Sequence, residues 1–122
     1  MAKTILIVDD SASVRHVVKI ALTTAGYDVI QADNGQSGLV QLDGKKIHLI
    51  ISDVNMPVMD GIRFVIEAKQ RPKYKFTPVI MLTTEAGDEM KNSGRAAGVK
   101  AWVIKPFEPR QMLAAVEKLI AA

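Results

Sequence analysis

Hydrophobic residues fall into five short runs along the chain, each long enough for one β-strand. Four of these runs are almost continuously apolar, which is typical of strands covered on both faces in a parallel sheet. The run at 28–32 is more polar, and this pattern favours an edge strand. The predicted strands are Ile5–Val8, Asp28–Ala32, Leu49–Ser52, Val79–Leu82 and Ala101–Ile104.

Segments with a helical spacing of apolar residues separate these runs. The predicted helices are a stripe from Val14 to Ala25 that ends at Gly26, then residues 34–42, 61–69 and 88–97, and a last helix beginning near Pro109. Strand and helix alternate five times, which predicts a doubly wound α/β domain with helices on both faces of a parallel sheet. We expect one domain over residues 1–122, with no second domain.

Composition narrows the class of protein. The chain has 122 residues, of which 48% are apolar and 24% charged, as in an ordinary globular protein. No apolar run approaches the roughly 20 residues of a membrane-spanning helix, and we expect no secretory leader. The chain has no cysteine, so it forms no disulfide, and we expect a cytoplasmic protein that does not bind membranes. The P-loop spacing of glycines and lysine is absent, which excludes a P-loop nucleotide hydrolase.

Net charge is +3, and basic residues gather at Lys69, Arg71, Lys73 and Lys75, with Lys45–Lys46 elsewhere. This cluster has two interpretations. It is a surface for an acidic partner, or it is a solvated loop and helix end. No nucleic-acid-binding module accompanies the cluster, so the second interpretation is favoured and we expect no nucleic acid partner.

Charged and polar side chains follow the central predicted strands. In a parallel sheet the carboxyl ends of the strands meet at one edge, where ligands bind. Carboxylates about 4 Å apart repel each other by on the order of 4 kcal/mol in a protein-like dielectric, and a hard divalent cation such as Mg²⁺ relieves that repulsion. The residues brought to this edge are Asp9, Asp10, Asp53, Thr83 and Lys105.

The same residues match a phosphoryl group. Lys105 offers a point charge and Thr83 a hydroxyl donor for phosphoryl oxygens. Asp53, on the central strand, is the best candidate for a carboxylate nucleophile that forms an aspartyl phosphate, with Asp9 and Asp10 left to hold the metal. Each residue alone has an ordinary alternative: Asp10 as a helix cap, Thr83 as a sheet residue, Lys105 as a solvated side chain. Their joint placement favours the functional interpretation.

Four segments carry a resemblance to a known family. "ILIVDDS", "LIISDVNMPVMDG", "PVIMLTTE" and "AWVIKPF" closely resemble the receiver domain of two-component response regulators, and most of all the stand-alone, chemotaxis-type (CheY-like) regulators. The resemblance covers essentially the whole chain. It implies a flavodoxin-like (βα)5 domain with strand order 2-1-3-4-5 and no output domain.

The resemblance also implies roles for single residues. Asp53 is the expected phosphoacceptor, and Mg²⁺ is expected on Asp10, Asp53 and the Asn55 carbonyl, with Asp9 acting through water. Lys105 is the expected phosphate contact, and its bond to Pro106 is expected to be cis. The protein is then not an enzyme in the usual sense, but a phosphoacceptor that takes phosphate from acyl phosphates and loses it again by itself.

A switch is implied as well. Thr83 is the expected switch hydroxyl, and Trp102 occupies the aromatic position of the last strand, where Tyr or Phe is common. Trp102 has two interpretations: a ring that moves inward, or a fixed packing residue. Asn55 and Glu85 flank the expected path of the hydrolytic water, which implies fairly quick dephosphorylation; Glu85 has a solvated loop residue as its alternative.

The expected partners are a chemotaxis-type histidine kinase as phosphodonor and an effector protein, with the flagellar motor switch protein as one candidate. The effector is expected on a surface formed by the fourth helix, the last strand and the last helix of a monomer. The fourth helix departs from the chemotaxis pattern, with a less apolar face, at Lys91, Gly94 and Arg95. The main alternative function is a phosphate sink or phosphorelay intermediate that does not bind the motor; a flavin-type ligand site and a metal-dependent phosphatase fit the residues less well.

Other polar residues are expected to be structural or solvated. His16 lies on the polar side of the first helix and His48 precedes a strand. Asp60 is the expected N-cap of a helix that begins at Gly61, and Asp33 and Asp88 are interpreted in the same way.

Overall fold

The computed structural model describes residues 2–84 and 87–121, with only the backbone described for 88–90 and 121. Strands and helices alternate as predicted, and a short 3₁₀ helix, η1, follows the third helix. The strands are β1 (Thr4–Val8), β2 (Asp28–Ala32), β3 (Leu49–Ser52), β4 (Val79–Thr83) and β5 (Ala101–Ile104). The helices are α1 (Ala12–Thr24), α2 (Gly35–Gln41), α3 (Gly61–Lys69), η1 (Pro72–Tyr74), α4 (Asp88–Ala97) and α5 (Pro109–Ala121).

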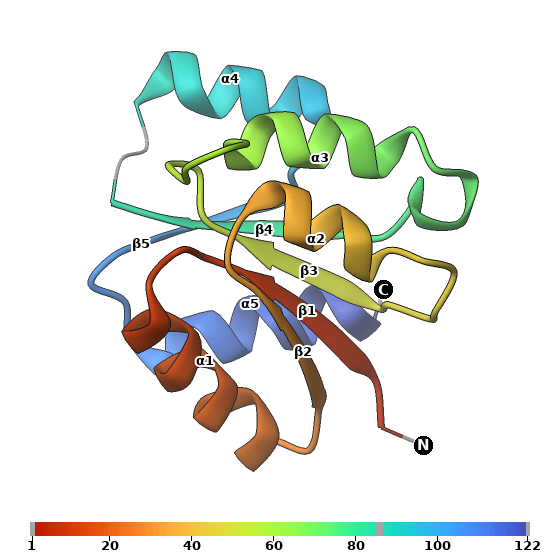
Figure 1. Ribbon diagram of the computed structural model, residues 1–122. Helices are drawn as coiled ribbons and strands as arrows, with labels where there is room; N and C mark the ends of the chain where they lie inside the picture. The colour runs from red at the N-terminus through yellow and green to blue at the C-terminus, as the bar shows by residue number, and fades with distance from the viewer. Residues whose placement is uncertain (1, 85–86, 122) are drawn as a thin grey trace.

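The five strands form one parallel sheet in the order β2-β1-β3-β4-β5, with α2, α3 and α4 on one face and α1 and α5 on the other (Figure 1). This confirms the flavodoxin-like fold and the strand order 2-1-3-4-5. Within the described residues, no helix is long and apolar enough to cross a membrane.

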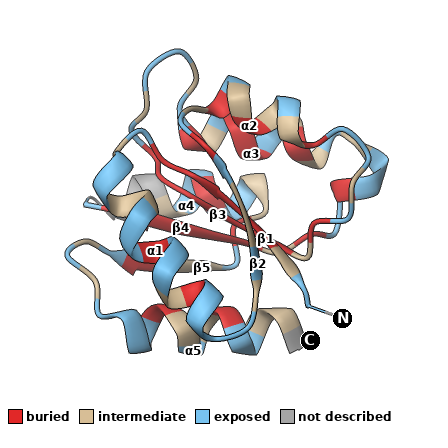
Figure 2. Cartoon of the chain, turned by 60° about the horizontal axis from the view of Figure 1, so that its bottom comes forward, coloured by how far each residue is buried: buried red, intermediate tan, exposed pale blue. Residues whose placement is uncertain are grey.

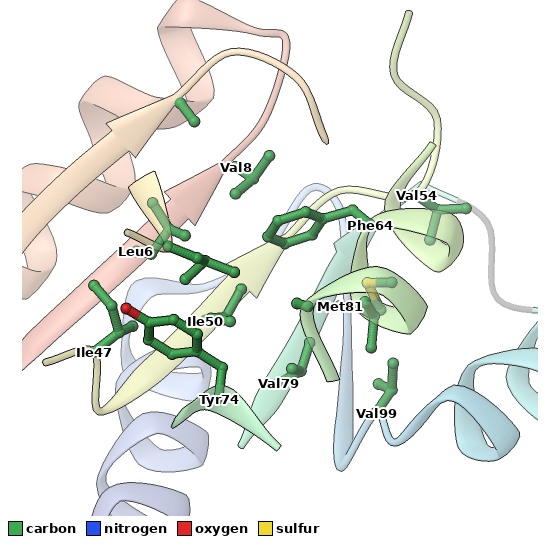
Figure 3. Close-up of a cluster of buried hydrophobic side chains, with 14 residues drawn as sticks. Leu6, Val8, Ile47, Ile50, Val54, Phe64, Tyr74, Val79, Met81 and Val99 are labelled. Atoms are coloured by element: carbon green, nitrogen blue, oxygen red, sulfur yellow. The ribbon is translucent and has the colours of Figure 1, made fainter. Parts of the chain in front are cut away.

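Both faces of the sheet are covered by apolar cores, which is why the central strands are continuously apolar. Successive side chains of a strand point to opposite faces. Leu6 and Val8 therefore join a first core under α2 and α3, whereas Ile5 and Ile7 join a second core under α1 and α5. Figure 3 shows the first core, and Figure 2 shows that the central strands β1, β3 and β4 are largely buried, whereas β2 and the outer surfaces of the helices are more exposed.

The basic cluster has a structural role. Arg71 illustrates it, because its guanidinium donates to two carbonyls at the C-terminal end of α2, those of Leu39 and of the C-cap residue Leu42. Lys75 instead lies over the exposed ring of Phe76. The main-chain acceptors are Thr77 for Lys69, Leu39 and Leu42 for Arg71, and Gly44 for Lys73. Three of the four clustered side chains thus join η1 and its flanks to neighbouring main chain, which differs from the solvated loop and helix end that the sequence favoured.

One of the three predicted aspartate caps is confirmed. The Asp60 carboxylate accepts from the main chain of the first turn of α3 at 2.8 Å. The predictions for Asp33 and Asp88 are wrong. Asn34 caps α2 because that helix begins one residue later than predicted, and α4 begins at Asp88 itself, after Gly87.

His48 extends the pairing of β1 with β3. Its main-chain N–H donates to the Thr4 carbonyl at 2.8 Å, and its Nδ1 accepts from the Thr4 N–H at 3.0 Å. Nδ1 accepts only while it is unprotonated. Burial, together with the charges of Lys46 and Lys3, holds the pKa of His48 below its usual value of 6.5.

Because the folded state lowers the pKa of His48, we expect the free energy of unfolding to depend on pH. The unfolded chain takes up a proton near pH 6.5 and the folded chain only at lower pH, so stability falls as pH decreases through this window. In His48→Asn, Oδ1 replaces Nδ1 as the acceptor and does not titrate. We expect urea unfolding between pH 7.5 and pH 5 to show a smaller loss of stability in this variant than in the wild type. His16→Asn, at an exposed histidine, is the control; equal pH slopes for the wild type and His48→Asn would contradict the prediction.

Candidate functional site

The register of β1 and β3 places two aspartates side by side. Val8 pairs with Ser52, so the next residues, Asp9 and Asp53, leave the sheet next to each other at its carboxyl edge. The Asp53 N–H continues the pairing by donating to the Val8 carbonyl at 2.9 Å. Asp9 is 1% exposed and Asp53 7% exposed, so two carboxylates lie almost entirely out of water.

Lys105 joins the two carboxylates. Its Nζ lies 2.8 Å from Asp9 Oδ2 and 3.3 Å from Asp53 Oδ2. Its main chain is placed by the sheet, because its N–H donates to the carbonyl of Thr83, the last residue of β4, at 2.8 Å. The bond from Lys105 to Pro106 is cis, as expected. Thr83 is fully buried at this edge of the sheet.

Asp10 completes a cluster of three acids. Asp9, Asp10 and Asp53 each offer a carboxylate oxygen, and these atoms all lie within 4.8 Å of one another. Asp10 does not cap α1, because Ser11 does so by accepting from the first turn of that helix. The Asp10 side chain is exposed, so the cluster is open to solvent on one side.

The charges in the site do not balance. Burial, followed by the negative charge of Asp9, raises the pKa of Asp53 above its usual value of 3.8, while Lys105 and the Val54 N–H act in the opposite direction. Burial alone would lower the pKa of Lys105, but its hydrogen bond to Asp9 and the charges of both carboxylates outweigh burial and raise it. The Lys105 ammonium thus pairs with two members of a cluster of three carboxylates. The donor set is all oxygen, which fits a hard divalent cation such as Mg²⁺.

Gly61 supports the main chain of Asp53. Its N–H donates to the Val54 carbonyl at 2.8 Å. A Cβ added at this glycine would lie 1.8 Å from the Asp53 carbonyl oxygen, so no other residue fits without moving the strand end. The start of α3 therefore packs directly against the main chain that carries Asp53.

The loop between β3 and α3 contains a tight turn. The Met59 N–H donates to the Pro57 carbonyl at 2.8 Å, and Val58 between them has a φ of 71°. This is a γ-turn with a positive φ at its centre, an unfavourable conformation for a β-branched residue. Asn55 lies exposed near the start of the same loop. Glu85, the other residue expected to influence dephosphorylation, lies outside the described residues.

Trp102 lies against α4. It is partly buried and packs against the first core. A Cβ added at Gly94 would lie 2.4 Å from Cζ2 of the ring. Glycine at position 94 therefore gives the indole room against the helix, a reason for this residue that the sequence alone did not provide.

Sequence reasoning missed Arg15. Its Nη1 donates to the Asp9 carbonyl oxygen at 2.6 Å, from the first turns of α1. The available signal was its place six residues after Asp9, at the start of a helix that follows the acidic pair.

A doubly wound sheet with three acids and a lysine at its carboxyl edge is the arrangement expected of a receiver domain, a class of phosphoacceptor signalling domain. The response regulator receiver domain family model matches residues 5–117, and the chain belongs to that family. Within the family it is a CheY-like receiver of two-component signalling.

Individual relatives agree with this assignment. The chain is 34% identical over 118 residues to the chemotaxis protein CheY1 of Helicobacter pylori, covering 95% of each chain. It is 42% identical to the Vibrio cholerae chemotaxis protein CheY4, with a TM-score of 0.94 over 98% of this chain and 99% of that chain. A receiver domain of a Pseudomonas aeruginosa sensor histidine kinase has the same fold (23% identity, TM-score 0.91, 100% of both chains) and was solved with magnesium coordinated in its active site cleft. Receiver domains bind Mg²⁺ at an acidic pocket, and this chain has an acidic cluster at the corresponding edge of its sheet.

The site predicts that Asp53→Asn stabilises the metal-free protein. Because the folded state raises the pKa of Asp53, its ionised form costs stability at neutral pH, and this cost disappears as pH falls below the usual value of 3.8. We expect a higher Tm for Asp53→Asn than for the wild type at pH 7 in a metal chelator. We also expect Mg²⁺ to raise the Tm of the wild type more than that of the variant.

Asp60→Asn is the matched control, because asparagine retains the helix cap at an exposed aspartate. A lower Tm for metal-free Asp53→Asn than for the wild type would contradict the prediction.

Proposed function

We propose that the protein is a cytoplasmic signalling switch in which Asp53 accepts a phosphoryl group, with Mg²⁺, from a chemotaxis-type histidine kinase. The observation that carries the proposal is the grouping of Asp9, Asp10 and Asp53 within 4.8 Å of one another, with Lys105 Nζ 3.3 Å from Asp53 Oδ2. Acyl phosphates of small molecules serve as alternative donors.

The two carboxylate oxygens of Asp53 have different surroundings, which supports Oδ2 as the atom that accepts the phosphoryl group. Oδ1 accepts from the Val54 N–H at 2.7 Å, whereas Oδ2 faces Lys105. Oδ2 forms a bond to phosphorus as the bond from phosphorus to the donor nitrogen or oxygen breaks, and the leaving atom keeps the electron pair. The Lys105 ammonium then lies beside the transferred phosphoryl oxygens, and the buried Thr83 hydroxyl donates to another of them.

The metal would be held by Asp10, Asp53 and the Asn55 carbonyl, with Asp9 acting through water. The bound ion supplies positive charge between the carboxylates and the phosphoryl group. The fit rests on the all-oxygen donor set and on the excess negative charge of the site. Asn55 and Glu85 would then influence how quickly water removes the phosphoryl group, so that the protein dephosphorylates itself.

The output would be a change on the surface formed by α4, β5 and α5. Thr83 is drawn toward the phosphoryl group and Trp102 responds, which changes the face offered to an effector protein. Ile104 on β5 is already 47% exposed, so this face offers apolar area. The flagellar motor switch protein is the candidate effector, and the protein acts as a monomer.

Phosphorylation is tested by intact mass spectrometry. We expect the wild type, given Mg²⁺ and acetyl phosphate, to gain one phosphoryl group at short times, because the Asp53 carboxylate is held beside Lys105. A metal chelator removes the gain, Asp53→Asn prevents it, and Asp60→Asn leaves it unchanged. An adduct that persists in Asp53→Asn would contradict Asp53 as the acceptor. A wild type that gains no phosphoryl group and does not respond to beryllofluoride with Mg²⁺ would contradict the proposed function.

Trp102 and Gly94 give a test of the switch surface. In Gly94→Ala the added methyl group would lie 2.4 Å from the ring, so the indole must move. We expect its fluorescence maximum to shift to longer wavelength without ligand, and the response to Mg²⁺ with beryllofluoride to become smaller. Ser93→Ala, at an exposed neighbour on α4, is the control and leaves both unchanged. Emission of Gly94→Ala identical to that of the wild type would contradict the role of Gly94.

A further inference from the structure

We propose that Arg15 is a positioning residue for the Mg²⁺ site: its contact with the Asp9 carbonyl fixes the main chain from which Asp9 and Asp10 extend. This inference rests on the proposed function, because it assigns Arg15 a part in holding the cation ligands. Arg15 itself would not touch the ion or the phosphoryl group.

The contact spans the start of α1. Arg15 Nη1 lies 2.6 Å from the Asp9 carbonyl oxygen, and the Arg15 N–H donates to the Ser11 carbonyl at 3.0 Å. The side chain is partly buried and lines a polar depression beside the end of β2, together with Gln31, Ala32, Asp33 and Ser37. The guanidinium is thus anchored on the helix and reaches back to the strand end.

The other polar groups of Asp9 have partners of their own. Its N–H donates to the Ala32 carbonyl at 3.1 Å. Its Oδ1 accepts from the Ser11 N–H at 2.9 Å, and its Oδ2 accepts from Lys105 Nζ at 2.8 Å. The carbonyl is the remaining group, and Arg15 supplies its donor. All four polar groups of this metal-site aspartate are therefore held.

The direction of the Asp9 carbonyl also constrains the main chain at Asp10. The peptide group that joins the two residues is planar, so fixing the direction of the Asp9 carbonyl fixes the direction in which the chain enters Asp10. Asp10 is exposed and lies between the end of β1 and the cap of α1. Its approach to the other two carboxylates depends on that peptide plane.

Charge and position predict opposite effects of removing Arg15. The guanidinium is always charged, and a nearby positive charge repels a cation. If Arg15 acted through charge alone, its removal would strengthen Mg²⁺ binding. If it positions the ligands, its removal weakens binding despite the lost repulsion. If it only joins α1 to β1, its removal lowers the free energy of unfolding but leaves the Mg²⁺ affinity of the folded protein unchanged.

The test is calorimetric titration of MgCl₂ into the wild type and Arg15→Met. Loss of a residue that orients metal ligands typically weakens metal binding by about 10- to 100-fold, and we expect a loss of about tenfold. Arg15→Lys retains a charged donor and should recover part of the affinity. Lys19→Met removes an exposed positive charge from the same helix and should not weaken binding. Circular dichroism and urea unfolding measure the stability of each variant separately.

The outcomes separate the possibilities. Equal or tighter Mg²⁺ binding by folded Arg15→Met would overturn the inference while leaving the proposed function intact. If Arg15→Met does not fold, Arg15→Gln, whose side chain is uncharged and shorter, replaces it in the titration, and wild-type affinity together with reduced stability in that variant would likewise overturn the inference. A wild type that binds no Mg²⁺ would overturn both the proposed function and the inference that rests on it.

Discussion

The repulsion among three carboxylates at one edge of the sheet is the constraint on which the site depends. Asp9 and Asp53 are buried there, and Lys105 lies between them as their shared ion-pair partner. Lys105 and the Arg15 guanidinium together bring two positive charges to three carboxylates, so the free protein retains excess negative charge at a partly buried place. This excess makes the site suited to a divalent cation, which brings positive charge. A phosphoryl group then adds further oxygen ligands for that cation.

The fold imposes this arrangement through strand register. The two acids meet because Val8 pairs with Ser52, and Lys105 joins them because its N–H extends the pairing of β4 with β5. Cores on both faces of the sheet hold the strands in that register. The energy that buries the central strands thus also opposes the separation of like charges at their ends.

The sequence predicted the strands and their terminal residues because parallel strands deliver their carboxyl ends to one edge. The contacts that long side chains make across loops could not be predicted from the sequence, since the reach of these side chains depends on how helices and loops pack. Arg71, counted in sequence as part of a charged patch, instead caps α2. Arg15 had no signal beyond its place on a helix, yet it contacts Asp9. The predicted cap at Asp33 was wrong because the neighbouring Asn34 is an equally good cap. A shift of one residue in the start of a helix is not visible in the hydrophobic pattern.

The identity of the modified residue tests the central claim most directly. Borohydride reduces an aspartyl phosphate to homoserine, which peptide sequencing by mass spectrometry locates. After brief treatment of the wild type with Mg²⁺ and acetyl phosphate, homoserine should be found at position 53 and at no other aspartate. Homoserine at Asp9 or Asp10, or its absence from a protein that carries phosphate, would contradict the assignment of Asp53 as the nucleophile.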